Sequence, residues 1–181
     1  MFNREALLEA LELGGRFQVE HWREGELLAT YDFHNEITTE GKNALLDIMF
    51  HNDTQIDTWY LGLVDAAAFS ATSANDVYAQ IDGSNGWDEF ADYDYSANST
   101  ARAEWQEDAA SGGQISNTTV ATFDITGSGS VWGVHLVGGG TDADVQSANA
   151  GGGTLWATAN FTANVSVANT DQLKVTYTVT A

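Results

Sequence analysis

The side chains most able to do chemistry in this sequence are its histidines and acids. His34 and Glu36 have the His-x-Glu spacing of half a zinc deaminase site, but that site also needs a Pro-Cys-x-x-Cys segment, and the chain contains no proline and no cysteine. The histidines fall in separate predicted elements and share no metal-ligand spacing. We interpret His34 as the end of a strand that leads into a helix, and we expect His21 and His135 to be satisfied strand residues.

Motifs for covalent catalysis and for phosphate binding are also missing from the sequence. No Gly-x-Ser-x-Gly is present, and the lack of cysteine excludes a thiol nucleophile, a disulfide and a thiolate zinc site. The glycine runs at 138–140 and 151–153 lack the following helix and the lysine that a phosphate loop needs. We expect loop tips at these runs, and we expect that the protein is not an enzyme.

Calcium is the metal that these residue types suit best, because its preferred ligands are carboxylate and carbonyl oxygens. Acidic pairs occur in predicted loops, but none fits an EF-hand loop, and close pairs also arise by chance in a chain with a net charge of −20. We predict no bound metal or cofactor, with weak calcium candidates at Asp92, Asp94, Asp142 and Asp144. A carboxylate pair for glycoside hydrolysis could come from residues beside Trp87 and Tyr93, but the sequence singles out none among Asp88, Glu89, Asp92 and Asp94.

The charge balance excludes one large class of partner. The chain has 26 acidic residues against six lysines and arginines, so phosphate backbones repel its surface, and we expect no nucleic-acid binding. No apolar run approaches the ~18 residues of a membrane span, and the acidic start does not fit a signal peptide. We expect a protein that is made in the cytoplasm and does not enter a membrane.

A short amphipathic helix is predicted near the start of the chain, over residues 3–13, within an N-terminal arm at 1–15. Three leucines form one stripe of this helix (Leu7, Leu8 and Leu11), and glutamates occupy the opposite side. Asn3 can cap its start, and Gly14 and Gly15 end it. Eleven residues are marginal as an isolated helix. The helix must therefore dock on its own domain or on another molecule, and the sequence leaves both open.

The rest of the chain, residues 16–181, reads as one β-rich domain. A hairpin is predicted at 15–33 with a turn at 23–26, and a helix at about 39–50 begins at Thr38 or Thr39 and turns Ala44, Leu45, Ile48 and Met49 to the core. Strands are expected at 58–64, 115–125, 130–138, 154–161 and 172–179. The strand at 130–138 is expected to be central in its sheet, because it is apolar on both faces. An irregular excursion at 65–112 contains one or two short strands and a further strand candidate at 77–81. The pattern favours an antiparallel β-sandwich or jelly-roll-like domain with one crossover helix.

The order of these segments resembles a known family. The hairpin ends in YDFHNEIT and is followed by TEGKNALLDIMF, TWYLGLV, WDEFADY, RAEWQEDAASGGQISNTTVATFDI, VWGVHLVGG, GTLWATANF and LKVTYTV. This succession is similar to small structural proteins found in the genomes of tailed bacteriophages, and the likeness covers residues 17–181. Its motifs are structural, and no catalytic residue is carried over. The helix at 3–13 and the strong acidity depart from the family pattern.

The resemblance implies a virion protein. The net charge of the chain indicates where in the virion it lies. Packaged DNA presents phosphate inside a capsid, so an acidic protein is expected on the outer surface of the virion. The resemblance implies a capsid decoration (cement) protein that braces neighbouring major capsid subunits without covalent bonds, as a homo-oligomer for which a trimer is favoured. The candidate interface residues are apolar or aromatic: Leu7, Leu8, Leu11, Trp87, Tyr93, Trp105, Trp132 and Trp156.

Three other functions remain open at this point. The chain could be a tail, collar or fibre component, or a host-surface module that stacks a glycan on Trp87, Tyr93, Tyr95 or Trp105. It could be a glycan-cleaving enzyme built on the carboxylates near residue 90. It could also be a generic β-sandwich binding module without a place in a virion.

Overall fold

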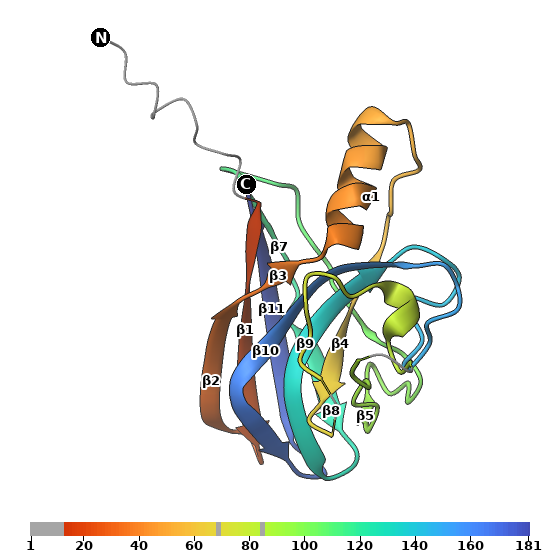
Figure 1. The fold of residues 1–181 in the computed structure, drawn as a ribbon. Helices are drawn as coiled ribbons and strands as arrows, with labels where there is room; N and C mark the ends of the chain where they lie inside the picture. The colour runs from red at the N-terminus through yellow and green to blue at the C-terminus, as the bar shows by residue number, and fades with distance from the viewer. Residues whose placement is uncertain (1–12, 68–69, 84–85) are drawn as a thin grey trace.

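The computed structural model describes residues 13–67, 70–83 and 86–181, and Figure 1 shows their arrangement. Two antiparallel sheets pack against each other, with one α-helix, α1 (Thr39–Phe50), beside one end of the strands. This confirms the predicted β-sandwich-like class and its single crossover helix. The helix predicted at 3–13 lies almost wholly outside the described residues.

The two sheets, here called sheet A and sheet B, interleave segments from the whole chain. In sheet A the order is β2 (Glu26–His34), β1 (Gly14–Arg23), β11 (Gln172–Thr180), β8 (Ala121–Ile125) and β5 (Tyr93–Asp94), with β7 (Gln114–Ser116) also paired to β11. In sheet B the order is β3 (Glu36–Ile37), β10 (Thr154–Val167), β9 (Gly129–Gly138), β4 (Trp59–Asp65) and β6 (Ala103–Glu104). β9 is the middle strand of sheet B, as its two apolar faces predict.

The N-terminal hairpin follows from its alternating pattern. β1 and β2 pair from Arg16 with His34 to Arg23 with Glu26. Gly25 occupies the turn with φ +81°, a conformation that glycine adopts without a Cβ clash. Phe17, Val19 and His21 are buried on one face, as predicted. Phe17 stacks on Tyr177 of β11, with ring centroids 4.1 Å apart, so the hairpin face becomes part of the core between the sheets.

Helix α1 is positioned by its first turn. Thr38 is the N-cap, and its Oγ1 accepts a hydrogen bond from the Gly41 amide at 2.9 Å. A Cβ on Gly41 would lie 2.7 Å from the Trp156 carbonyl oxygen, so only glycine permits this approach of helix to sheet. Glu40 accepts hydrogen bonds from the amides of Tyr78 (2.8 Å) and Leu155 (2.6 Å). These contacts fix the start of α1, whereas its other end extends past the strands.

That overhang corrects one expectation about the helix face. Ala44, Leu45 and Ile48 are half-buried, but Met49 is 64% exposed and Phe50 is 82% exposed. Met49 was predicted to face the core because of its spacing from Leu45. The spacing is right for the face, but the last turn of the helix has no sheet beneath it.

The excursion at 65–112 covers the outer face of sheet B and creates a second core. It contains β5, β6 and a 3-10 turn, η2 (Tyr78–Gln80), at the place where a strand was predicted. That strand prediction was wrong: the Gln80 side chain accepts a hydrogen bond from the Val77 amide (3.1 Å) and closes a turn. The second core is built by residues of the excursion, sheet B and the β9–β10 loop: Val64, Tyr78, Ile81, Trp87, Val137, Ala143 and Leu155.

Two strand boundaries also differ from the predictions. The strand expected at 115–125 is two strands, β7 and β8, because the Asn117 side chain takes over the hydrogen bonding between them: its Oδ1 accepts from the Tyr177 amide (2.8 Å) and its Nδ2 donates to the Val175 carbonyl (3.2 Å). β10 continues to Val167, six residues past the expected end, through a register irregularity between Asn160 and Val165.

Candidate interaction surface

Four aromatic residues that the sequence suggested as interface contacts lie in the interior instead. Trp87, Tyr93, Trp105 and Trp156 are buried, with at most 8% of any of them exposed. Trp87 lies in the second core over sheet B. Tyr93, Trp105 and Trp156 belong to the main core between the sheets, so contacts distant in sequence bury residues that resemble a surface patch in the sequence. Trp132 is half-buried against the second core. Leu7, Leu8 and Leu11 lie outside the described residues.

A buried charge cluster of Glu89, Arg102 and His135 lies between sheet B, which carries His135 on β9, and the layer that covers it. Arg102 Nη2 donates to Glu89 Oε2 at 2.8 Å, and Arg102 Nε lies 3.0 Å from both carboxylate oxygens. Both side chains are fully buried. Arg102 also donates to the carbonyls of Ala143 (3.1 Å) and Ala148 (2.9 Å), while Glu89 accepts from the Ser147 amide (2.8 Å). The pair therefore fastens the excursion to the β9–β10 loop.

His135 lies beside this pair, with its Nε2 3.6 Å from Glu89 Oε1. Neither ring nitrogen has a hydrogen-bond partner among the described residues, which corrects the expectation of a satisfied histidine. Burial and the nearby Arg102 charge hold the pKa of His135 well below its usual range, so the ring is neutral. Burial raises the pKa of the Glu89 carboxyl, and Arg102 opposes that shift.

Gly62 on β4 makes room for the buried charge cluster. A Cβ at this position would lie 2.2 Å from His135 Nε2 and 2.4 Å from Glu89 Oε1. Because the Glu89 carboxylate is committed to Arg102 and closed off from solvent, it is not available as an accessible acid for a glycan. The sequence signal that could have pointed here is a single arginine, Arg102, inside a strongly acidic stretch.

The calcium candidates do not converge on one site. Asp92 and Asp94 flank buried Tyr93, while Asp142 accepts a hydrogen bond from the Tyr78 hydroxyl. Burial and Asp142 raise the pKa of Tyr78 to about 12. Asp144, with Asp53 and Asp57, lines a polar cleft of about 580 Å³ beside α1. Within the described ranges, no three acidic or histidine side chains come close enough to hold a metal ion together.

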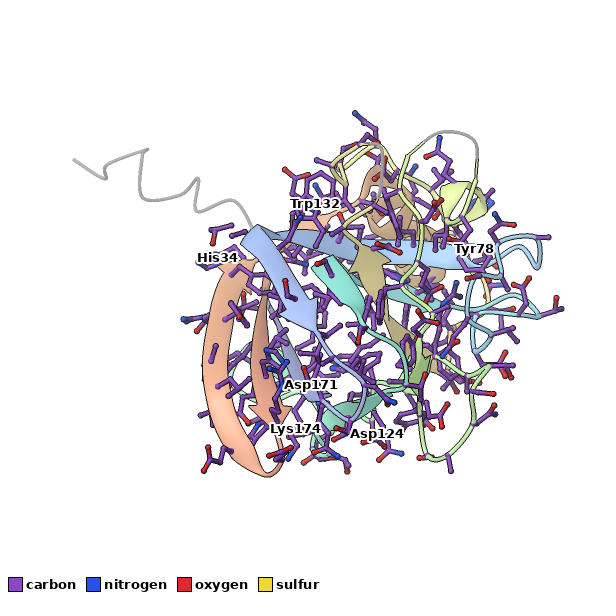
Figure 2. The ribbon with its side chains drawn as sticks, turned by 90° about the horizontal axis from the view of Figure 1, so that it is seen from below. His34, Tyr78, Asp124, Trp132, Asp171 and Lys174 are labelled. Carbon is purple, nitrogen blue, oxygen red and sulfur yellow. The ribbon has the colours of Figure 1, made fainter. Side chains whose placement is uncertain are left out.

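A second polar cluster closes the turn between β10 and β11. Asp171 is buried, and its carboxylate accepts hydrogen bonds from Arg23 (2.6 and 2.7 Å), His21 Nε2 (2.7 Å) and the Ala168 amide (2.8 Å). These donors, Arg23 first, hold the pKa of Asp171 well below its usual range. Figure 2 shows Asp171 near Lys174 and Asp124, far from Tyr78 and the second core. The cluster ties β1 to this turn, which explains the burial of His21.

An apolar groove is lined by side chains of α1 and of the strands beside it. It lies between α1 and the ends of β7 and β11, and it has a volume of about 530 Å³. Leu45, Ile48 and Met49 form the helix side, and Ile115 and Val179 form the strand side. Trp105 and Trp156, buried in the main core, contribute to its floor. Leu46 and Phe50 extend the exposed apolar surface along α1 beyond the groove.

A basic cleft adjoins the apolar groove. Arg16, His34 and Lys42 line it, and it shares Leu13, Gln114 and Thr180 with the groove. Arg16 is paired with Asp32 of the neighbouring strand. Two of the six lysines and arginines of the chain therefore lie beside the groove. An apolar slot flanked by positive charge is suited to an amphipathic, acidic partner.

Comparisons with known proteins do not assign this surface. No protein-family model matches the sequence, and no curated protein matches it. Among the described residues, none of the helices has the length and apolar character needed to cross a membrane. The assignment of function therefore depends on the surface itself and on the resemblance noted above.

Proposed function

We propose that this chain is a structural protein of a tailed-bacteriophage virion, placed on the outer surface of the capsid, where it braces neighbouring major capsid subunits without covalent bonds. The order of its sequence segments, which resembles small virion proteins of such phages, supports the proposal. A net charge of −20 supports an external position, because the DNA-filled interior would repel it.

The observation that carries the proposal is the apolar groove with the overhanging end of α1. Leu46, Met49 and Phe50 are 54%, 64% and 82% exposed on one helix. Contiguous apolar surface of this kind, rimmed by polar residues, marks interaction sites in soluble proteins. The remaining surface is strongly acidic and stays hydrated. An exposed apolar surface on a strongly acidic protein suits a function that depends on contact with neighbours.

Bracing of this kind needs no turnover. A protein that binds the assembled lattice but not separate subunits stabilises the lattice by RT ln(1 + [L]/Kd), about 2.7 kcal/mol per site at a concentration of 100 Kd. Summed over many sites, this resists internal pressure. The chemistry required is apolar burial and shape, which the groove and α1 can supply.

Cryo-EM of particles that contain this chain is the direct test. We expect density on the outer capsid surface at hundreds of copies, with the α1 end facing the particle or a neighbouring copy. Density at six or twelve copies on the tail would replace the capsid role with the tail, collar or fibre role. Absence of the chain from particles would refute both.

Particle binding by variants tests which surface makes the contact. Phe50→Ser with Leu46→Ser should abolish co-sedimentation with particles that lack the protein. The matched control is Leu27→Ser with Leu28→Ser, because these residues are also about half exposed (47% and 49%) but lie at the turn of the β1–β2 hairpin, at the opposite end of the strands from α1. Equal loss of binding in both double variants would contradict the assignment to α1.

A further inference from the structure

We infer that the apolar groove binds the N-terminal helix of a neighbouring copy of this chain, so that copies link arm to groove. The arm helix is the helix predicted over residues 3–13. For its role on the particle, this inference rests on the proposed bracing function. The exchange itself is a property of the isolated protein and can be tested without particles.

The arm helix and the surface around the groove have complementary chemistry. The stripe of Leu7, Leu8 and Leu11 matches a groove lined by leucine, isoleucine, methionine and tryptophan side chains. On the other side of the arm helix are Glu5, Glu9 and Glu12. An amphipathic helix laid in an apolar groove is a common recognition mode. Here the basic cleft adjoins the groove and shares Leu13, Gln114 and Thr180 with it.

The charge match is specific because positive charge is scarce in this chain. Arg16 and Lys42 are two of only six lysines and arginines, and both line the basic cleft beside the groove. Arg16 is already paired with Asp32, so the exposed Lys42 is the cation of the cleft that is most open to an acidic partner. The arm helix combines three glutamates with three leucines in eleven residues. It fits both parts of the surface at once.

The proposed bracing function favours a neighbouring copy over the same chain, because an arm bound by its own domain would not link copies. Leu13 packs against the main core and lines both the apolar groove and the basic cleft. Leu13 is not helical and directly precedes β1, so the arm joins its own domain where the apolar groove and the basic cleft meet. We expect the arm to occupy the groove of another copy, and mixing of variants separates this from docking within one chain.

An arm-to-groove contact is heterologous, because two different surfaces meet. Heterologous contacts close into rings when the rotation between copies permits. A closed ring would fill every groove with one arm and would present several copies to the lattice together. This is the form of homo-oligomer that the arm and groove predict.

The test uses full-length variants of each partner surface. The arm variant is Leu7→Ser with Leu11→Ser, and the groove variant is Met49→Glu, which places a charge at a largely exposed position on the helix side of the groove. The matched control is Leu28→Glu, at a similarly exposed position in the hairpin. In sedimentation equilibrium we expect wild type and control to self-associate. Either variant should weaken association about 100-fold, the effect of removing one or two buried leucine-sized contacts.

Mixing the two variants separates exchange between copies from docking within one chain. The groove variant has an intact arm and the arm variant has an intact groove, so a mixture can form one productive junction and should give a heterodimer. A mixture that stays monomeric while wild type self-associates would overturn arm exchange. Wild type that is monomeric at 100 µM, a concentration on the order of the affinities typical of weak contacts, would also overturn it.

A charge-reversal pair provides an independent measurement. Lys42→Glu should weaken self-association about tenfold, and Glu9→Lys in the arm should restore part of that loss in the double variant. No restoration would place the acidic face elsewhere and overturn the docked orientation. The inference and the proposed function can fail separately. Monomers that still bind particles would refute arm exchange alone. Oligomers that bind no particle would refute the bracing function alone.

Discussion

The outer face of sheet B and the groove beside α1 are both apolar, but the described residues cover the first and leave the second exposed. Over sheet B, the excursion and the β9–β10 loop bury the second core and are fastened by Glu89 and Arg102. At the groove, the described residues leave Met49 and Phe50 largely exposed. A buried, hydrogen-bonded ion pair holds the cover over sheet B in place. The groove is apolar, and no comparable ion pair among the described residues holds a segment over it.

This difference indicates that the layer over sheet B contributes to folding stability and that the groove is the surface available for binding a partner. A buried ion pair costs desolvation energy and is tolerated when each charge is fully hydrogen-bonded, so the layer over sheet B should respond strongly to any break. An exposed apolar surface contributes little to folding and is free to bind. Substitutions in the two regions should therefore affect different measurements.

The largest effect is expected from breaking the buried pair. Glu89→Gln leaves the Arg102 charge buried without a counter-ion, and we expect a loss of about 3–5 kcal/mol in the free energy of unfolding, measured by urea denaturation. Replacing both residues, Glu89→Met with Arg102→Leu, should recover most of that loss, because no charge then remains buried. If the double variant were as unstable as the single one, the pair would not be the fastening.

A smaller loss is expected when the space beside the buried charge cluster is filled. Gly62→Ala places a methyl group within 2.2 Å of His135 Nε2, so strand or side chain must shift, at a cost of about 1–3 kcal/mol in urea denaturation. Gly86→Ala is the matched control, since its nearest neighbour is 3.8 Å away and its φ is not positive. The control should change stability by less than about 0.5 kcal/mol. Equal losses would show that glycine matters here for flexibility and not for space.

The lowered pKa of His135 predicts how the free energy of unfolding depends on pH. Its pKa in the folded protein lies well below 6.5, whereas the unfolded chain binds the proton near 6.5. Below pH 6.5 the unfolded state therefore takes up a proton that the folded state refuses, and stability falls by as much as about 1.4 kcal/mol per pH unit until the folded pKa is reached. Above pH 6.5 this contribution is constant.

The variant His135→Gln isolates that contribution. Urea denaturation from pH 8 to pH 4.5 should show a shallower acid decline for the variant than for wild type, starting at pH 6.5. His51→Gln is the control, because this exposed histidine follows α1 and lies outside both cores. Parallel profiles for wild type and His135→Gln would mean that the folded protein accepts the proton at position 135.

The smallest effect on stability is expected at the groove end. Phe50→Ser removes a side chain that is 82% exposed, so the free energy of unfolding should change by no more than about 0.5 kcal/mol. The same change should reduce binding to particles, measured by co-sedimentation. A loss of stability above 1 kcal/mol would place Phe50 in the folded core and remove the contrast between the two regions.

Much of the fold was predictable because local patterns coincide with the final structure. Alternation at Phe17, Val19 and His21 predicted the hairpin face, and Thr38, one of the two predicted start residues, is the N-cap of α1. The double-sided apolar character of β9 predicted its central place. Each of these depends on neighbours in sequence, which is why the pattern alone was sufficient.

The candidate site was much less predictable. Trp87, Tyr93, Trp105 and Trp156 have the composition of a sticky surface, but contacts more distant in sequence bury them. The groove joins residues from α1, β4, β7 and β11, which no local pattern connects. The interface role of Leu7, Leu8 and Leu11 stays a prediction.

The sequence by itself determined the class of protein: a β-sandwich with a capped crossover helix, strongly acidic and without cysteine. These properties follow from composition and short-range periodicity, which act before the chain is folded. Only the tertiary structure decided which apolar residues are buried and which are exposed to solvent. That choice depends on whether a distant segment, such as the one carrying Arg102, returns to cover a given face and finds partners for its buried charge.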